Sequence, residues 1–162
     1  MSRFDYLCPH ADEARIFDES MVHLPDNRHQ VIADAYDFSG ATLIADIGGG
    51  NGEALRRILG RFPGPRGLVF DRDDVVAAIP EVARMAGRIA TESGSFLDRV
   101  PRGADIYLLV RVLHDWSDAD CRRILKNCRA AMKGDAHLLI CEQILEPDPA
   151  RGDPIVYLID TT

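Results

Sequence analysis

The sequence lacks the features that mark proteins of membranes, of the secretory route and of nucleic-acid complexes. No apolar run in it approaches the roughly 18–20 residues that a helix needs to span a bilayer. The opening MSRFDYLCPHADEAR has no apolar core of the kind that a secretion signal carries. A net charge of −7 argues against a surface that follows phosphates, which relies on clustered Lys and Arg. We therefore expect a cytoplasmic protein that binds neither membrane nor nucleic acid.

Paired cysteines are absent as well. The four cysteines are Cys8, Cys121, Cys128 and Cys141, and none of them belongs to a CxxC pair. Their spacing argues against a disulfide framework and against a zinc site, so we expect a reduced chain without a bound metal. Internal repeats are also missing, and 162 residues with 46% hydrophobic content are enough for one sizeable core.

Short apolar runs alternate with helical patterns along the chain. Strands are predicted at 41–47, 67–70, 88–91, 106–110 and 137–141, and helices at 11–22, about 26–36, 52–59, 73–86 and 117–132. Ser117 is expected to cap the last helix, with Asp120 completing a capping box. The alternation predicts an α/β fold, a doubly wound parallel sheet with helices on both faces. We divide the chain into a helical lead-in, residues 1–39, and an α/β domain, residues 40–162.

The most informative local pattern follows the first predicted strand. Asp46 lies near its end, and Gly48, Gly50 and Gly52 come after it in a G-x-G-x-G spacing. Glycines let the backbone turn tightly and approach a ligand, and the next helix directs free N–H groups to the same place. Dinucleotide-binding enzymes favour G-x-G-x-x-G, but Glu53 stands where their third glycine would be. The observed spacing is closer to the loop that holds the amino-acid end of S-adenosylmethionine, whose ammonium group an acidic residue such as Asp46 attracts.

Two further residues lie where predicted strands end. Asp71 comes 19 residues after Gly52. A carboxylate there either accepts both hydroxyls of a ribose, in NAD and S-adenosylmethionine alike, or caps a helix. His114, in the stretch VRVLHDWSD, follows the fourth predicted strand, where open α/β sheets place their ligand crevice. A neutral imidazole there can take up a proton, although a lone His also serves structural roles.

Residues 40–147 resemble the small-molecule O-methyltransferases that include plant caffeic acid O-methyltransferases and bacterial antibiotic-tailoring enzymes. The resemblance rests on the stretches YDFSG, ADIGGGNG, FD, GSF, ADIYLLVRVLHDWSD, CRRILKNCRAAM and LLICEQILEP. It implies a Rossmann-like class I methyltransferase sheet and S-adenosylmethionine as cofactor. It also implies methyl transfer to a hydroxyl group, typically phenolic, of a small molecule.

The resemblance also implies roles for individual residues. His114 would be the general base that deprotonates the acceptor, and Glu142 the carboxylate that orients it. The acceptor side and the methyl-transfer pocket would be lined by Asp115, Trp116, Phe17 and Met21, although the last two also suit plain core packing. Cofactor contacts are expected from Asp46, Gly48, Gly50, Gly52, Asp71, Ser95, Phe96 and Arg111.

Several features depart from the family pattern. Ser95 replaces an adenine-contacting carboxylate, and Val110 stands where members often carry Lys four residues before the catalytic His. Arg111 is adjacent, but strand neighbours point to opposite faces. Members also carry a helical, dimer-forming domain before this region and further strands with a second catalytic carboxylate after it. We therefore expect a chain truncated at both ends, with a sheet incomplete at its C-terminal edge, and leave homo-oligomerisation open.

Two alternatives to an active methyltransferase stay open. One is a catalytically silent remnant that binds S-adenosylmethionine or S-adenosylhomocysteine and acts through association. The other is an NAD-dependent oxidoreductase, which the misplaced third glycine and the LHDWSD stretch disfavour. The methyl acceptor cannot be read from the sequence, because family members build its pocket mostly from segments that this chain lacks.

Overall fold

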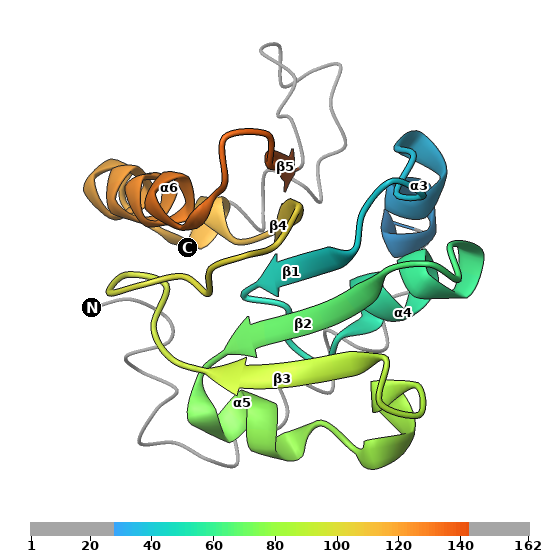
Figure 1. The fold of residues 1–162 in the computed structure, drawn as a ribbon. Helices are drawn as coiled ribbons and strands as arrows, with labels where there is room; N and C mark the ends of the chain where they lie inside the picture. The colour runs from blue at the N-terminus through green and yellow to red at the C-terminus, as the bar shows by residue number, and fades with distance from the viewer. Residues whose placement is uncertain (1–27, 143–162) are drawn as a thin grey trace, which may run out of the picture.

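A parallel five-stranded sheet forms the centre of the protein in the computed structural model, which describes residues 28–142 (Figure 1). The strand order is β3-β2-β1-β4-β5, and every neighbouring pair is parallel. The strands are β1 (Leu43–Ile47), β2 (Arg66–Asp71), β3 (Ile89–Ser93), β4 (Ile106–Val110) and β5 (His137–Cys141). The order runs outward from β1 in both directions and therefore reverses between β1 and β4. Ligands of such sheets bind at the carboxyl ends of the strands beside this switch point.

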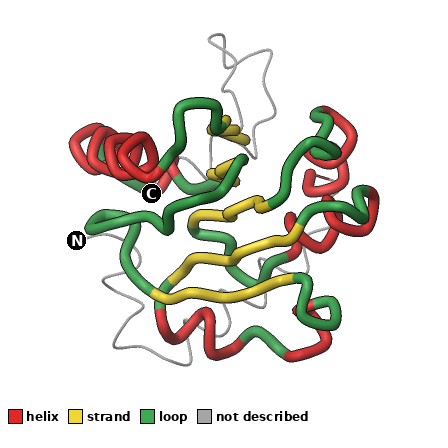
Figure 2. Tube along the Cα trace, viewed as in Figure 1, coloured by secondary structure: helices red, strands yellow, loops and turns green. Residues whose placement is uncertain are grey.

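Helices cover both faces of the sheet, which confirms the predicted α/β fold. They are α3 (Arg28–Ala35), α4 (Glu53–Arg61), α5 (Asp73–Ala78) and α6 (Asp118–Ala131), with single 3₁₀ turns η1 (Glu81–Arg84) and η2 (Leu113–Asp115). Figure 2 shows α6 to one side of the strands, with α3 and α4 to the other. None of the helices within residues 28–142 is long and apolar enough to cross a membrane.

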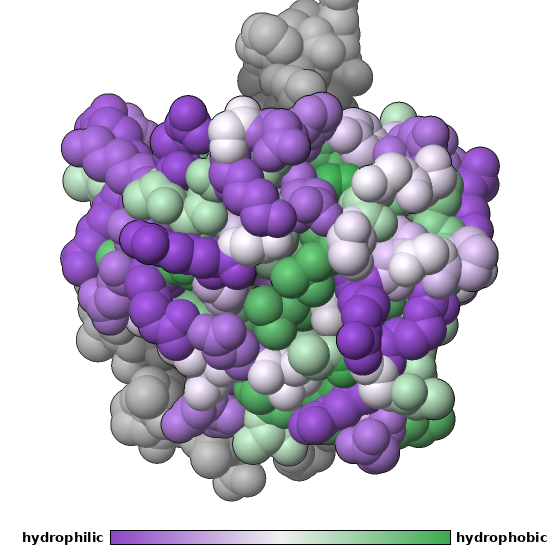
Figure 3. Space-filling model, viewed as in Figure 1, coloured by the Kyte–Doolittle hydropathy of each residue, from purple (hydrophilic) through white to green (hydrophobic). Residues whose placement is uncertain are grey.

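Two hydrophobic cores form because successive strand residues point to opposite faces. In β4, Ile106 and Leu108 join the core under α3 and α4, whereas Tyr107 and Leu109 join the core under α6. Buried parallel strands need apolar residues on both faces, which explains the continuous run IYLLV. Figure 3 shows hydrophobic side chains gathered over the middle of the sheet, between hydrophilic margins.

The predicted helix over 73–86 is wrong as a single element. The helix α5 ends at Ala78, Ile79 is extended, and a separate 3₁₀ turn begins at Glu81. Pro80 explains the break, because it has no N–H to donate and disfavours helical geometry in the residue before it. Predicted strands 106–110 and 137–141 match β4 and β5 residue for residue. The predicted helix over 11–22 lies outside the described residues.

The helix α6 begins as predicted, with Ser117 as its N-cap. The Ser117 hydroxyl oxygen accepts a hydrogen bond from the Asp120 backbone N–H at 3.2 Å. The hydroxyl itself donates to the Asp120 carboxylate at 2.7 Å. This cap fixes the start of α6 directly after the segment that carries His114.

Candidate active site

The glycine loop connects β1 to α4 at the carboxyl edge of the sheet. Gly48, Gly50 and Gly52 have φ angles of +73°, +55° and +79°, in the left-handed region that glycine adopts without steric cost. The Gly48 N–H donates to the Phe70 carbonyl oxygen at 2.8 Å, which ties the loop to β2. These positions explain why the sequence needs glycine at alternate residues.

One side of this loop is tightly packed and the other is open. A Cβ atom on Gly48 would lie 2.9 Å from Val112 Cγ2, in the segment that follows β4. Among residues 28–142, no atom lies within 4 Å of a Cβ atom built on Gly50. Within this part of the chain the loop therefore packs against the β4 side through Gly48 and is open beside Gly50.

Asp46 lies beneath the loop and is buried. Its side chain is 1% exposed, and neither carboxylate oxygen has a hydrogen-bond partner among residues 28–142. A Cβ atom on Gly49 would lie 2.8 Å from Asp46 Oδ2, so the loop backbone covers the carboxyl group closely. Burial raises the pKa of Asp46 to about 7, and the negative charge of Asp71 adds to the rise. A cation brought near this carboxylate would relieve both effects.

Asp71 ends β2 on the opposite side of the loop from β4. Its Oδ2 accepts the Gly50 N–H at 2.9 Å, and its Oδ1 accepts the Arg72 N–H at 2.8 Å. Burial raises the pKa of Asp71, although these two backbone amides oppose the rise. Each carboxylate oxygen can accept a second hydrogen bond, which leaves Asp71 able to receive hydroxyl donors.

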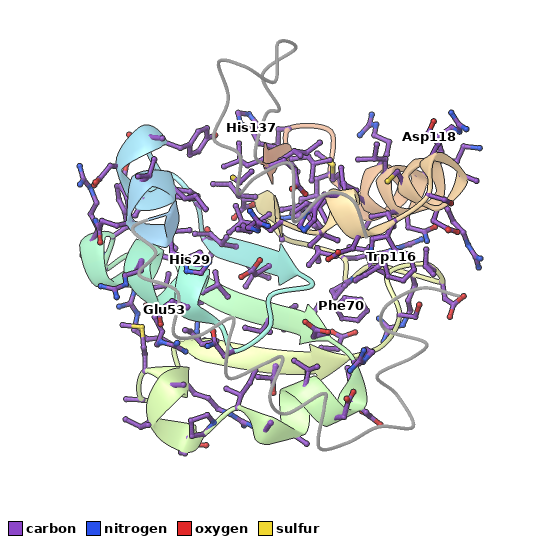
Figure 4. All side chains as sticks on the ribbon, turned by 180° about the vertical axis from the view of Figure 1, so that it is seen from behind. His29, Glu53, Phe70, Trp116, Asp118 and His137 are labelled. Atoms are coloured by element: carbon purple, nitrogen blue, oxygen red, sulfur yellow. The ribbon has the colours of Figure 1, made fainter. Side chains whose placement is uncertain are left out.

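An aromatic pair borders the same loop. The rings of Phe96 and Trp116 meet edge to face, with centroids 5.3 Å apart and planes at 86°. A Cβ atom on Gly48 would lie 3.4 Å from Phe96 Cε1, which places this ring against the glycine loop. Figure 4 shows Trp116 and Phe70 together near the carboxyl ends of the strands. The pair offers an apolar wall between the glycine loop and the turn that follows β4.

His114 is held by Glu142, although 28 residues separate them. The His114 Nδ1 lies 2.9 Å from Glu142 Oε2, while Glu142 Oε1 accepts the backbone N–H groups of Val112 and Leu113, each at 2.8 Å. Both side chains lie at the carboxyl ends of their strands, β4 and β5. An imidazole whose Nδ1–H donates to a carboxylate keeps its Nε2 free to accept a proton.

The imidazole is accessible from outside the protein. Its side chain is 30% exposed, and Asp115 Oδ2 lies 3.5 Å from its Nε2. Because β1 and β4 are neighbours in the sheet, the turn that carries His114 and the glycine loop share one edge. Val112 marks their junction, since it contacts Gly48 with its side chain and Glu142 with its N–H. A proton acceptor and a glycine cradle thus lie at the same edge of the sheet.

Comparison with known proteins shows which family the chain belongs to. The family described as the O-methyltransferase domain matches residues 1–157. The chain belongs to this family. It is 37% identical over 147 residues to the mitomycin biosynthesis 6-O-methyltransferase of Streptomyces lavendulae, a match that covers 89% of this chain and 42% of that protein. The chain therefore spans less than half the length of this curated relative.

Solved O-methyltransferase structures share the fold. A mitomycin 7-O-methyltransferase superposes with a TM-score of 0.87 at 36% identity, covering 99% of this chain and 48% of the other. An O-methyltransferase of neocarzinostatin biosynthesis was solved with S-adenosylmethionine and 2-hydroxy-5-methyl naphthoic acid. It gives a TM-score of 0.77 at 30% identity, covering 86% of this chain and 44% of that one. The five strands of this O-methyltransferase domain therefore form a class I methyltransferase sheet.

Most of the site residues predicted from the sequence lie in two groups in this O-methyltransferase domain. The first surrounds the glycine loop and the second surrounds His114, with Phe96 and Trp116 between them. Phe17 and Met21 lie outside the described residues. The Ser95 hydroxyl oxygen accepts the Leu97 N–H at 3.2 Å and so stabilises its own turn. Arg111 has a φ of +54° and donates its N–H to the Cys141 carbonyl at 2.9 Å, and its contact with a cofactor stays a prediction.

Sequence reasoning missed two residues of α6 that hydrogen-bond the segments carrying Phe96 and His114. The Asn127 amide donates to the carbonyl oxygens of Phe96 and Leu97 at 2.9 and 2.8 Å. The Cys121 thiol contacts the turn that carries His114. Both belong to the quoted stretch CRRILKNCRAAM, whose residue types gave no sign of these contacts.

Proposed function

We propose that this chain is the cofactor-binding part of an S-adenosylmethionine-dependent O-methyltransferase that acts on a hydroxyl group, typically phenolic, of a small molecule. The observation that carries the proposal is the His114–Glu142 pair, 2.9 Å apart, at the same sheet edge as the glycine loop. Family membership supports the reaction class. We assign residues 40–162 to the methyltransferase domain and residues 1–39 to a helical lead-in.

The residues around the glycine loop suit S-adenosylmethionine. The buried carboxylate of Asp46 has no hydrogen-bond partner among the described residues, and the cofactor's positive charge would compensate it. Asp71 retains acceptor capacity for the ribose hydroxyls, and the space beside Gly50 admits a ligand. Phe96 would border the adenine side. When bound, S-adenosylmethionine supplies a methyl group on a sulfonium sulfur, which the acceptor oxygen takes in line, leaving S-adenosylhomocysteine.

His114 would supply the base. With Nδ1–H donating to Glu142, its Nε2 accepts the acceptor's hydroxyl proton and raises the nucleophilicity of the oxygen. Glu142 then stabilises the imidazolium and keeps the ring in one orientation, because its other oxygen is anchored on two backbone amides. Asp115, 3.5 Å from Nε2, and Trp116 would line the acceptor side. We also propose a cytoplasmic location and leave self-association to experiment.

The proposal is tested by isothermal titration and by turnover. We expect S-adenosylmethionine and S-adenosylhomocysteine to bind and NAD not to bind. His114→Ala should reduce methyl transfer to a phenolic panel, including hydroxynaphthoic acids, by about 100-fold or more, while cofactor affinity stays within about twofold. His137→Ala is the matched control, since His137 bonds Tyr36 at the amino end of β5, the opposite end of the strand from Glu142 (Figure 4). A His114→Ala variant with most of the original rate would remove His114 as the base.

One observation favours a second function, binding without catalysis. Ser95 replaces the family's adenine-contacting carboxylate, and its hydroxyl is already engaged with Leu97. A weakened adenine contact suits a silent remnant that acts through association. Binding of S-adenosylmethionine with no methyl transfer to any acceptor would support this function over the enzyme.

A further inference from the structure

The turn that presents His114 is too short to be stable by itself. It is a three-residue 3₁₀ helix, Leu113–Asp115, closed by the Trp116 N–H donating to the Leu113 carbonyl at 3.1 Å. Single 3₁₀ turns have poor hydrogen-bond geometry, and one such bond fixes several dihedral angles. The position of the His114 ring therefore depends on what holds this turn from outside.

Cys121 holds the turn from the side of α6. Its Sγ lies 3.3 Å from the Leu113 carbonyl oxygen and 3.5 Å from the Trp116 carbonyl oxygen, so both ends of the turn are within reach of its single S–H proton. The thiol sits in the first turn of α6, where its backbone N–H donates to Ser117 at 2.8 Å. Burial raises the pKa of the Cys121 thiol, and the charge of Asp118 adds to the rise, so the donor proton is retained at neutral pH.

Glu142 holds the same turn from the opposite side. It accepts the Leu113 N–H, while Cys121 faces the Leu113 carbonyl, so the residue before His114 is fixed at both of its backbone polar groups. Glu142 also hydrogen-bonds the imidazole directly. Within the described residues, the Cys121 thiol donates only to backbone carbonyl oxygens of the turn. The two side chains act as opposed anchors for one short element.

We propose that Cys121 is a positioning residue for His114, whose thiol fixes the turn so that Nδ1 stays on Glu142 and Nε2 faces the acceptor. The expected effect of Cys121 on turnover rests on the proposed function, whereas its effect on the orientation of the His114 ring does not. The orientation of the His114 ring can be measured without any methyl transfer.

The experiment compares three variants of the full chain. Cys121→Ala removes the donor, Cys121→Ser restores a donor to the same carbonyls, and Cys128→Ala is the matched control. Cys128 lies seven residues after Cys121 in the same helix and is fully buried in the hydrophobic core. Its replacement by Ala shows how far the loss of a different thiol from α6 changes the same measurements. Thermal unfolding shows whether each variant is folded at the assay temperature.

Two measurements are made on each folded variant. In steady-state kinetics we expect Cys121→Ala to lower kcat by about 5- to 10-fold, with the KM for S-adenosylmethionine within about twofold. Cys121→Ser should recover most of the loss, and Cys128→Ala should retain kcat. In ¹⁵N NMR, the ring nitrogens of His114, one of five histidines, are assigned from a His114→Asn variant. The original protein, Cys121→Ser and Cys128→Ala should show protonated Nδ1, and Cys121→Ala a mixture of tautomers.

Unchanged ring-nitrogen shifts in Cys121→Ala would overturn the proposal, as would equal losses of kcat in Cys121→Ala and Cys128→Ala. A Cys121→Ser variant no better than Cys121→Ala in both measurements would also overturn it. If the original protein transfers no methyl group to any acceptor, the proposed function fails. The NMR comparison then still decides whether Cys121 positions His114.

Discussion

Asp46 allows the sharpest test of the site, because a negative charge on so deeply buried a side chain is costly. Its pKa rises from the ordinary 3.8 to about 7, through burial first and the charge of Asp71 second. One pKa unit corresponds to about 1.4 kcal/mol. The ionised side chain therefore lowers the free energy of unfolding by on the order of 4 kcal/mol relative to the protonated one.

The sign of the pH dependence follows from which state holds the proton. Below about pH 4 Asp46 is protonated in both the folded and the unfolded chain. Between about pH 4 and pH 7 only the unfolded chain releases the proton, so this group's contribution to stability falls as the pH rises. Above about pH 7, the pKa of Asp46 in the folded protein, this contribution to stability is fully lost. An amide in place of the carboxyl group cannot ionise and escapes this loss.

We therefore expect Asp46→Asn to be more stable than the original protein at pH 8, by on the order of 4 kcal/mol, with the difference vanishing towards pH 4. Urea unfolding followed by circular dichroism at several pH values measures it. Asp135→Asn, at an exposed carboxyl group, controls for the loss of one negative charge. A stability difference for Asp46→Asn that does not change between pH 4 and pH 8 would refute the assignment.

The same substitution should weaken binding of the cofactor. The proposed function assigns the Asp46 charge to compensating the positive charge of S-adenosylmethionine, so Asp46→Asn should raise the dissociation constant by about tenfold or more at pH 8. Isothermal titration measures this directly. A variant that is both more stable and unchanged in affinity would show that Asp46 is a buried charge without a role in binding.

The glycine loop and Glu142 supply two further predictions. Gly50→Ala places a methyl group in the open space beside the loop, so it should weaken cofactor binding in titration while backbone strain lowers stability by only about 1 kcal/mol. Gly48→Ala adds a contact 2.9 Å from Val112 Cγ2 and should lower the melting temperature further; equal melting temperatures would contradict the packing described. Glu142→Gln can still accept the amides of Val112 and Leu113, but its NH₂ favours the wrong His114 tautomer. We expect kcat to fall about 100-fold with the fold intact, and an unchanged kcat would remove Glu142 as the orienting group.

The strands and the glycine loop were predictable because their signals are local. The runs that form β4 and β5 are continuous and apolar, and the loop glycines need φ angles that other residues avoid. Pro80 was an equally local signal for the end of α5, but the predicted helix over 73–86 ran through it. Its missing N–H decides the break in the structure.

The contacts that organise the His114 turn were not predictable from residue patterns. Glu142 was expected to orient the imidazole, but its bonds to the amides of Val112 and Leu113 depend on how the ends of β4 and β5 meet. The contact of Ser95 with the cofactor stays a prediction, but the bond that its hydroxyl oxygen accepts from the N–H of a residue two positions later was not foreseen. Such partners depend on backbone geometry that residue types alone do not specify.

The helix α6 connects two backbone segments of the candidate site. Cys121 reaches the turn that carries His114, and Asn127 reaches the loop that carries Phe96. They lie six positions apart in the helix, a rise of about 9 Å, and the fully buried Ile124 between them fixes the helix on the sheet. The spacing between the proposed base and the proposed adenine wall therefore depends on how α6 packs on the sheet. Cys121 and Asn127 act on this spacing through the backbone carbonyl groups to which they donate hydrogen bonds.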